Sequence, residues 1–205
     1  MSQVIPLRPA QVPRDVTLAS RPDDELMLLA RGGLHAALAA LVERYAHRLA
    51  GYCAKFLGSA SLAGEICQET WLRVWVHRAS YRPEGKFVVL LYTTARNLCR
   101  NHARAARRRE HWLPATLAED ALDRAADDRP GHLDALLARE RRRDVLSALG
   151  TLPAPMREAL LLRFQEELSY EDISAIVGAP ESTVRSRVHH GLKQLRHDLA
   201  QGDSP

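Results

Sequence analysis

Aromatic residues are scarce in this chain, at 5% of 205 residues. Alanine, leucine and arginine abound instead, and they favour helices. No strand-like alternation of apolar and polar residues occurs along the sequence. The composition and pattern therefore predict an all-α fold.

Long apolar runs are also absent. No stretch of about 18 apolar residues occurs, as a membrane-spanning helix requires. The first 22 residues contain no apolar signal-peptide core. We therefore expect no membrane insertion and a cytoplasmic location.

Cysteine is rare, and its spacing carries no motif. The three residues, Cys53, Cys67 and Cys99, include no CxxC pair, which favours a reduced compartment. Cys99 and His102 are three residues apart, but two ligands do not make a structural zinc site. We predict no metal and no cofactor. Because no catalytic constellation is visible, we also predict that the protein is not an enzyme.

The net charge of +4 is too small to indicate nucleic acid by itself, so clustering of the cations matters more. One predicted helix, residues 87–110, combines arginines at four-residue intervals with amides. These residues are Arg96, Asn97, Arg100, Asn101, Arg104 and Arg108. The stripe suits a phosphate backbone, although cations also stabilise the C-terminal end of a helix. Tyr81, in the preceding loop with Lys86, is the aromatic residue best placed to stack on an unpaired base.

Apolar spacing and turn residues divide the chain into two small helical domains joined by a flexible linker. We predict a disordered tail (1–22), a first domain (23–112), an acidic linker (113–132) and a second domain (133–200). The predicted helices run from 23 to the glycine pair at 32–33, then over 34–57, 62–79, 87–110, 133–149, 153–164 and 170–177, and from 181 onward.

The second domain contains a predicted helix-turn-helix. Ser169 is placed to cap a helix, with Asp172 in the capping-box position. Gly178 suits the left-handed residue that ends this helix, and Pro180 suits the start of the next. The unit is typical of a protein that inserts its last helix into the DNA major groove.

The last helix has two distinct faces. Val184, Val188, Leu192 and Leu195 form an apolar face that we expect to pack on residues including Leu160 and Phe164. The opposite face and its flanks are polar or basic: Ser182, Thr183, Arg185, Ser186, Arg187, His189, His190 and Lys193. Small hydroxyls permit close approach to DNA, and arginines bind phosphates or guanine edges.

Both domains resemble one family. Leu152-Pro-x-x-x-Arg157, Leu168-Ser-Tyr-Glu-Asp-Ile173 and Ser182-Thr-Val-Arg-Ser-Arg187 resemble region 4 of bacterial sigma-70-type factors. Gln68-Glu-Thr-Trp-Leu-Arg-Val-Trp75 and Tyr92-Thr-Thr-Ala-Arg-Asn97 resemble region 2. The presence of these two regions alone is similar to the extracytoplasmic-function (ECF, group IV) sigma factors. The resemblance spans about residues 24–109 and 134–199.

The resemblance implies a factor that binds the clamp and flap of core RNA polymerase and directs it to promoter DNA. Region 4 would read the −35 element through Arg185, Ser186, Arg187, His189 and His190. Region 2 would hold melted −10 bases through the loop 81–86 and through Arg96, Asn97, Arg100 and Asn101. Glu65, Gln68 and Glu69 would dock on the clamp.

One departure from the family concerns this docking segment. The family usually has Asp-Ala-Glu-Asp where this chain has Leu62-Ala-Gly-Glu65. Loss of charge at such an interface weakens or slows docking. Ser59 and Ser61 lie beside the gap, and a phosphoserine adds about −1.5 to −2 charge. Two hypotheses for the regulation of this factor follow: a Ser/Thr kinase or an anti-sigma factor.

Three alternatives remain open at this stage. A one-component helix-turn-helix regulator would bind promoters tightly without polymerase. A DNA-processing enzyme such as a recombinase would cleave strands. An adaptor would bind polymerase without reading DNA.

Overall fold

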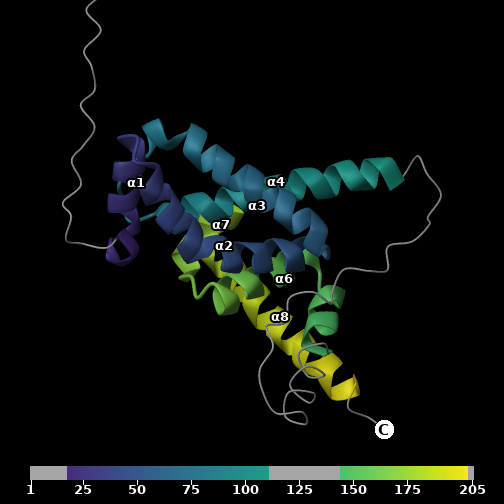
Figure 1. Cartoon of the computed structure of the whole chain (residues 1–205). Coiled ribbons are helices and arrows are strands. Elements are labelled where there is room, and N and C mark those ends of the chain that lie inside the picture. Colours follow the sequence, from purple (N-terminus) through teal and green to yellow (C-terminus); the bar gives the residue numbers. More distant parts are fainter. Residues whose placement is uncertain (1–17, 111–143, 203–205) are drawn as a thin grey trace, which may run out of the picture.

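The structure is a computed structural model that describes residues 18–110 and 144–202 (Figure 1). The first bundle consists of α1 (Asp23–Arg31), α2 (His35–Leu57), α3 (Ala60–Val76) and α4 (Phe87–Glu110), with short 3-10 turns η1 (Leu18–Ser20) and η2 (Arg78–Ser80). The second bundle consists of a helix over 144–151, α6 (Ala154–Leu160), the π-helical turn η3 (Leu161–Gln165), α7 (Tyr170–Val177) and α8 (Glu181–Gly202). No strand occurs within the described ranges, and the predicted all-α class is confirmed.

Three helix ends coincide with predicted capping residues, although α3 (Ala60–Val76) was expected over residues 62–79. The Ser59 hydroxyl accepts a hydrogen bond from the backbone N–H of Leu62 at 3.4 Å and begins α3. The Ser169 hydroxyl accepts one from Asp172 N at 3.0 Å and begins α7. Gly178 ends α7 at a φ of 64°, a left-handed conformation that favours glycine. Local sequence therefore fixes these boundaries.

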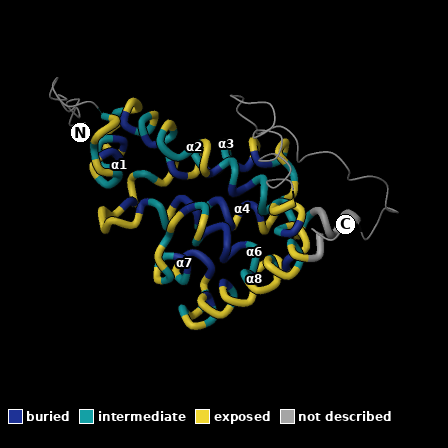
Figure 2. The backbone as a smooth tube through the Cα atoms, turned by 90° about the horizontal axis from the view of Figure 1, so that it is seen from below, coloured by how far each residue is buried: buried dark blue, intermediate teal, exposed yellow. Residues whose placement is uncertain are grey.

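One apolar cluster extends through both bundles, and the second bundle adds a smaller cluster around Leu152, Leu160 and Val188. Buried Leu162, Ile173 and Ile176 of the second bundle belong to the same cluster as Leu91 and Tyr92 of α4. Helix α7 packs directly on α4, and Figure 2 shows buried backbone where α4, α6 and α7 meet. The predicted linker, residues 113–132, lies outside the described residues. The sequence predicted two domains, and the structure adds the contact between them.

Two expectations need correction. The predicted disordered tail extended to residue 22, but η1 at residues 18–20 is folded against α2. There the Arg44 guanidinium donates to the backbone oxygens of Ala19 and Arg21, both at 2.8 Å. Phe164 was expected in the core and is 58% exposed. It lies in the π-helical turn η3, whose five-residue hydrogen-bond spacing alters the periodicity that predicted its burial.

The mid-helix Gly191 has a packing explanation. A Cβ atom at this position would lie 3.0 Å from Leu160 Cδ1 and 3.4 Å from Met156 Cβ. The absence of a side chain therefore lets α8 approach α6 closely.

None of the described helices combines the length and apolarity needed to cross a membrane.

Candidate nucleic-acid interface

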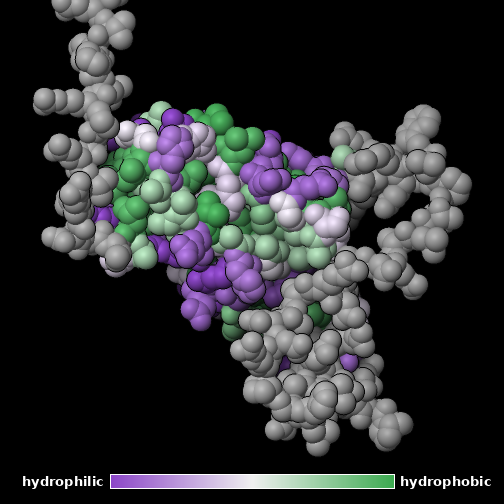
Figure 3. All heavy atoms as spheres, viewed as in Figure 1, coloured by the Kyte–Doolittle hydropathy of each residue, from purple (hydrophilic) through white to green (hydrophobic). Residues whose placement is uncertain are grey.

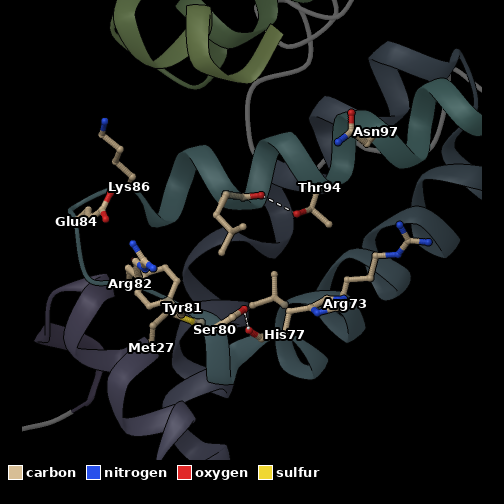
Figure 4. Close-up of a pocket in the computed structure, with 12 residues that line it drawn as sticks. Met27, Arg73, His77, Ser80, Tyr81, Arg82, Glu84, Lys86, Thr94 and Asn97 are labelled. Atoms are coloured by element: carbon tan, nitrogen blue, oxygen red, sulfur yellow. Dashed lines mark hydrogen bonds between the residues drawn. The ribbon is translucent and has the colours of Figure 1, made fainter. Parts of the chain in front are cut away.

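A cavity of about 520 Å³ opens beside the loop 81–86 of the first bundle (Figure 4). Residues of α1, α3 and α4 complete its wall. The lining residues are Met27, Arg73, Val74, His77, Ser80, Tyr81, Arg82, Glu84, Lys86, Leu90, Thr94 and Asn97. The sequence predicted Tyr81, Lys86 and Asn97 as DNA contacts, and the structure brings these three together.

The cavity combines cations with side chains that can hydrogen-bond to a base. Arg73, Arg82 and Lys86 supply positive charge suited to phosphate. His77 and Asn97 can read the polar edge of a base. The Thr94 hydroxyl donates to the Leu90 carbonyl at 2.8 Å and retains its acceptor lone pairs. The cavity therefore offers both cations and hydrogen-bonding groups, with the carboxylate of Glu84 among them.

Asp24 of α1 holds the cavity loop in place. Its carboxylate accepts a hydrogen bond from the Tyr81 hydroxyl and another from Gly85 N at 2.7 Å. Gly85 has a φ of 69°, which lets the loop turn back towards α1. The Arg31 guanidinium reaches the Tyr81 carbonyl at 3.4 Å. Sequence analysis missed Asp24 because its partners lie about sixty residues away along the chain.

Tyr81 itself lies deeper than the sequence suggested. It is 7% exposed, and its ring meets Phe87 edge-on at a centroid distance of 6.3 Å. Burial, with the hydrogen bond to Asp24, raises the pKa of Tyr81. In this conformation Tyr81 belongs to the cavity wall and offers little free ring surface for stacking.

A polar face of α4 continues from the cavity. Asn97, Arg100, Asn101 and Arg104 are exposed along it. Helix α4 runs out beyond the bundle, and Figure 3 shows hydrophilic side chains gathered there. The Arg108 side chain lies outside the described part of the chain. Four of the predicted α4 residues thus lie together on one accessible surface.

Arg96 differs from the other predicted α4 residues. It is buried, and its Nε donates to Glu158 Oε1 of α6 at 2.5 Å. The Tyr52 hydroxyl donates to the same oxygen at 3.3 Å. Arg96 therefore joins the two bundles in this conformation and is not available to DNA.

A second buried carboxylate, Glu166, strengthens the same contact. Arg48 Nε of α2 donates to Glu166 Oε2 at 3.1 Å, and the Tyr92 hydroxyl of α4 donates to the same oxygen. Burial, followed by the interaction with Glu166, raises the pKa of Tyr92. We call Arg48, Arg96, Glu158 and Glu166 the interbundle ion pairs. Sequence patterns missed them because each pair joins residues more than sixty positions apart.

Helix α8 presents the predicted DNA-reading residues on its outer side, which Figure 2 shows as exposed backbone. Val184 and Val188 are buried beneath it. The exposed residues are Ser182, Arg185, Ser186, His189, His190 and Lys193, while Thr183 and Arg187 are half-buried. The Arg185 guanidinium pairs with Glu181 at 3.0 Å and lies 4.3 Å above the Tyr170 ring centre. These contacts orient Arg185 at the start of α8.

Helix α3 presents an amphipathic outer stripe. Glu65 and Gln68 are exposed, and Glu69 pairs with Arg73 at 2.8 Å. Further along the helix, Leu72 is 56% exposed and Val76 is 59% exposed. Large apolar side chains beside polar ones are typical of a protein-binding surface. Ser61 is exposed in the first turn of the same helix, next to the capping Ser59.

No group of three or more His, Cys, Asp or Glu side chains that suits a metal ion occurs among the described residues.

Comparison with known families matches both bundles. Residues 41–109 match the family model of Sigma-70 region 2, and residues 142–195 match that of Sigma-70, region 4. The RNA polymerase sigma-H factor of Pseudomonas aeruginosa is 33% identical over 87% of this chain and 94% of its own length. The chain belongs to the sigma-70 family. The ECF RNA polymerase sigma-E factor of Haemophilus influenzae is 30% identical over 78% of this sigma factor and 85% of its own length.

The fold of this ECF sigma factor is also found among solved structures. The sigma factor RpoE of Bartonella quintana, in complex with the anti-sigma factor NepR, matches with a TM-score of 0.66 and 23% identity. The match covers 80% of this chain and 96% of that one. The family to which the chain belongs consists of transcription initiation factors, with a DNA-binding region 4.

Proposed function

We propose that this sigma factor binds core RNA polymerase and directs it to promoters, reading the −35 element with α8 and holding melted −10 bases in the cavity beside the loop 81–86. The observation that carries the proposal is the pair of DNA-suited surfaces on two different bundles. A one-component regulator needs only the DNA-reading face of α8.

The −35 element would lie against the outer face of α8. The exposed hydroxyls and imidazoles, with Arg185 and Arg187, offer donors and acceptors to base edges and phosphates. The buried Val184 and Val188 hold the helix rigidly from behind. The helix N-terminus adds a partial positive charge that favours a nearby phosphate.

The −10 element would occupy the cavity and the exposed face of α4. A volume of about 520 Å³ falls within the ~300–1,000 Å³ of ordinary small-molecule sites, which is room for a flipped nucleotide. Extruding a base costs a few kcal/mol, and contacts with the base and its phosphates offset this cost. Asn97 and Lys86 line the cavity, and Arg100, Asn101 and Arg104 would follow the strand away from it.

Polymerase would dock on both bundles. The exposed stripe of α3, with Glu65, Gln68, Glu69, Leu72 and Val76, would meet the clamp. The exposed Phe164 gives the second bundle an apolar contact point for the flap. A polar rim around apolar side chains is the usual anatomy of such interfaces.

Promoter binding requires the bundles to separate. The two elements are centred about 25 base pairs apart, which is ~85 Å of duplex at ~3.4 Å per base pair. Helix α8 has 22 residues and is only ~33 Å long at ~1.5 Å per residue. Residues 111–143, which join α4 to the second bundle, could span at most about 120 Å at ~3.6 Å per residue if fully extended. The interbundle ion pairs would therefore break when both elements are bound.

Two modes of control would act on α3, the helix that carries the proposed clamp-docking residues. Phosphorylation of Ser59 or Ser61 would add about −1.5 to −2 charge at the N-terminus of α3, where the helix dipole favours it and where the usual acids are missing. RpoE of Bartonella quintana forms a complex with the anti-sigma factor NepR, and an anti-sigma factor for this chain would instead cover its docking surfaces. Both modes remain hypotheses: a Ser/Thr kinase would act where this chain departs from the family, and an anti-sigma factor would act without any modification.

Run-off transcription on fragmented genomic DNA tests the proposal. Core polymerase should start RNA chains at a discrete set of promoters only when the sigma factor, or its Ser61→Asp variant, is present. Arg185→Ala with Arg187→Ala should abolish the promoter choice. Tight promoter binding without polymerase, and no polymerase-dependent starts from either protein, would favour a one-component regulator instead.

The same assay separates the two modes of control. Under kinase control Ser61→Asp should start more RNA chains than the wild type, whereas Ser61→Ala should not. Equal activity of all three proteins, with inhibition by an added anti-sigma factor, would contradict kinase control.

A further inference from the structure

The His190 ring lies on the outer face of α8, and the preceding helical turn holds it in one orientation. Its ring nitrogen Nδ1 is 2.9 Å from the Ser186 backbone oxygen and 3.2 Å from the Ser186 hydroxyl oxygen. The His189 ring meets the His190 ring edge-on at a centroid distance of 5.6 Å. Both histidines are exposed, whereas Val184 and Val188 are buried on the other side of the helix. His190 is therefore oriented on the face that would enter the DNA groove.

The contact with Ser186 decides which nitrogen of the neutral His190 ring carries the proton. A carbonyl oxygen can only accept a hydrogen bond, so the contact of 2.9 Å requires Nδ1 to donate. The Ser186 hydroxyl can donate or accept and adapts to either tautomer. A neutral imidazole has a single N–H, so its other nitrogen is an acceptor. Nε2 of His190 therefore offers a lone pair on the outer face of α8.

We propose that His190 selects adenine or cytosine at one position of the −35 element, because Nε2 accepts a hydrogen bond from the exocyclic amino group of the base. The inference rests on the proposed function and adds to it the class of base that this residue reads. In the major groove, adenine N6 and cytosine N4 donate, whereas guanine O6 and N7 and thymine O4 accept. A ring nitrogen that only accepts therefore discriminates against guanine and thymine at the contacted base.

His190 differs in this respect from its polar neighbours on α8. Arg185, Arg187 and Lys193 only donate, so they suit guanine edges and phosphates. The Ser182 hydroxyl both donates and accepts, so it discriminates little between bases. Replacement of His190 by arginine should therefore change the preferred base at its position to guanine.

The tautomer is measured on the full-length protein alone. Nitrogen NMR of the imidazole side chains at about pH 8.5, where a histidine is ordinarily neutral, distinguishes a protonated ring nitrogen from an unprotonated one. The His190 signals are identified by their absence from the spectrum of His190→Ala. We expect the proton on Nδ1 and none on Nε2. A proton on Nε2 would overturn the proposal.

The second measurement uses holoenzyme assembled from core polymerase and the sigma factor. Its affinity is compared, at the same pH, for all single-base variants of the −35 element of one promoter found by run-off transcription. We expect one position at which A or C binds about two- to ten-fold more tightly than G or T, the range of one hydrogen bond. His190→Ala should lose the preference at this position alone, and His190→Arg should favour G there. His197→Ala, which removes an exposed imidazole further along α8, should retain the wild-type profile.

The outcomes distinguish the role of His190 from the proposed function. An unchanged profile in His190→Ala would overturn that role, as would a lost position at which the wild type prefers G or T. Either result would leave the proposed function intact, because the wild-type holoenzyme would still discriminate among −35 elements. A wild-type holoenzyme that does not discriminate among them at all would overturn the proposed function and this inference together.

Discussion

Replacement of Glu158 by glutamine tests the contact between the two bundles. The substitution retains the shape of the side chain and an acceptor oxygen but removes the charge that faces Arg96. Both side chains of this pair are about nine-tenths buried. The guanidinium would be left in the closed structure without its counter-ion. In an open structure it would be solvated, so the penalty falls on the closed state alone.

The size of the effect follows from the burial of the pair. Breaking a buried ion pair by removing one partner costs about 3–5 kcal/mol. At ~1.4 kcal/mol per factor of ten, the equilibrium between closed and open forms should shift by about 100-fold to more than 1,000-fold towards the open form. The shared apolar core opposes opening, but the variant and the wild type carry it equally.

Hydrogen exchange followed by mass spectrometry measures this shift at α6, α7 and the facing part of α4. These segments should exchange faster in Glu158→Gln, and small-angle scattering should report a larger radius of gyration. Glu171→Gln is the matched control, because it removes the same charge from an exposed position on α7. Equal exchange in Glu158→Gln and Glu171→Gln would refute the reasoning.

Three further predictions concern the loop 81–86, two glycines and Tyr92. Asp24→Ala removes both acceptor oxygens that hold the loop 81–86 and should weaken promoter melting by about 1–3 kcal/mol. The loss should appear as lower permanganate reactivity of the −10 thymines, while binding to the −35 element is retained. Unchanged reactivity would contradict the role of Asp24. Gly64→Ala, at an open helical site, should raise the free energy of unfolding in urea by about 1 kcal/mol. Gly191→Ala should give no such gain, because the added Cβ would lie against Leu160. Equal gains for the two variants would contradict the packing explanation. The raised pKa of Tyr92 means that its contribution to stability is complete below pH 10, the ordinary value, and decreases as the pH rises above it, by up to ~1.4 kcal/mol per pH unit. Tyr92→Phe should therefore lose stability less steeply between pH 10 and 11, and an identical slope would contradict the assignment.

Much of the fold could be predicted because its signals are local. Ser59, Ser169 and Gly178 mark helix ends through contacts with residues at most four positions away. The two faces of α8 follow from helical periodicity, and Val184 and Val188 are buried as predicted. Such features depend on a short stretch of chain, and a single sequence contains them.

The features that sequence analysis missed join distant segments. Arg96 has the spacing of a phosphate-binding stripe, but its partner is Glu158, 62 positions further along the chain. The burial of Tyr81 depends on Asp24, 57 positions earlier. Tertiary contacts of this kind leave no periodic signal in one sequence.

The distance between the two bundles tests the central claim most directly. Fluorescence energy transfer between dyes on noncanonical residues at Glu43 of α2 and Ala175 of α7, both exposed, would report it without using the native cysteines. The free protein should show one population of high transfer. The complex with core polymerase and promoter DNA should show low transfer, as expected when the bundles bind elements ~85 Å apart. High transfer retained in an actively transcribing complex would contradict the separation of the two bundles on the promoter.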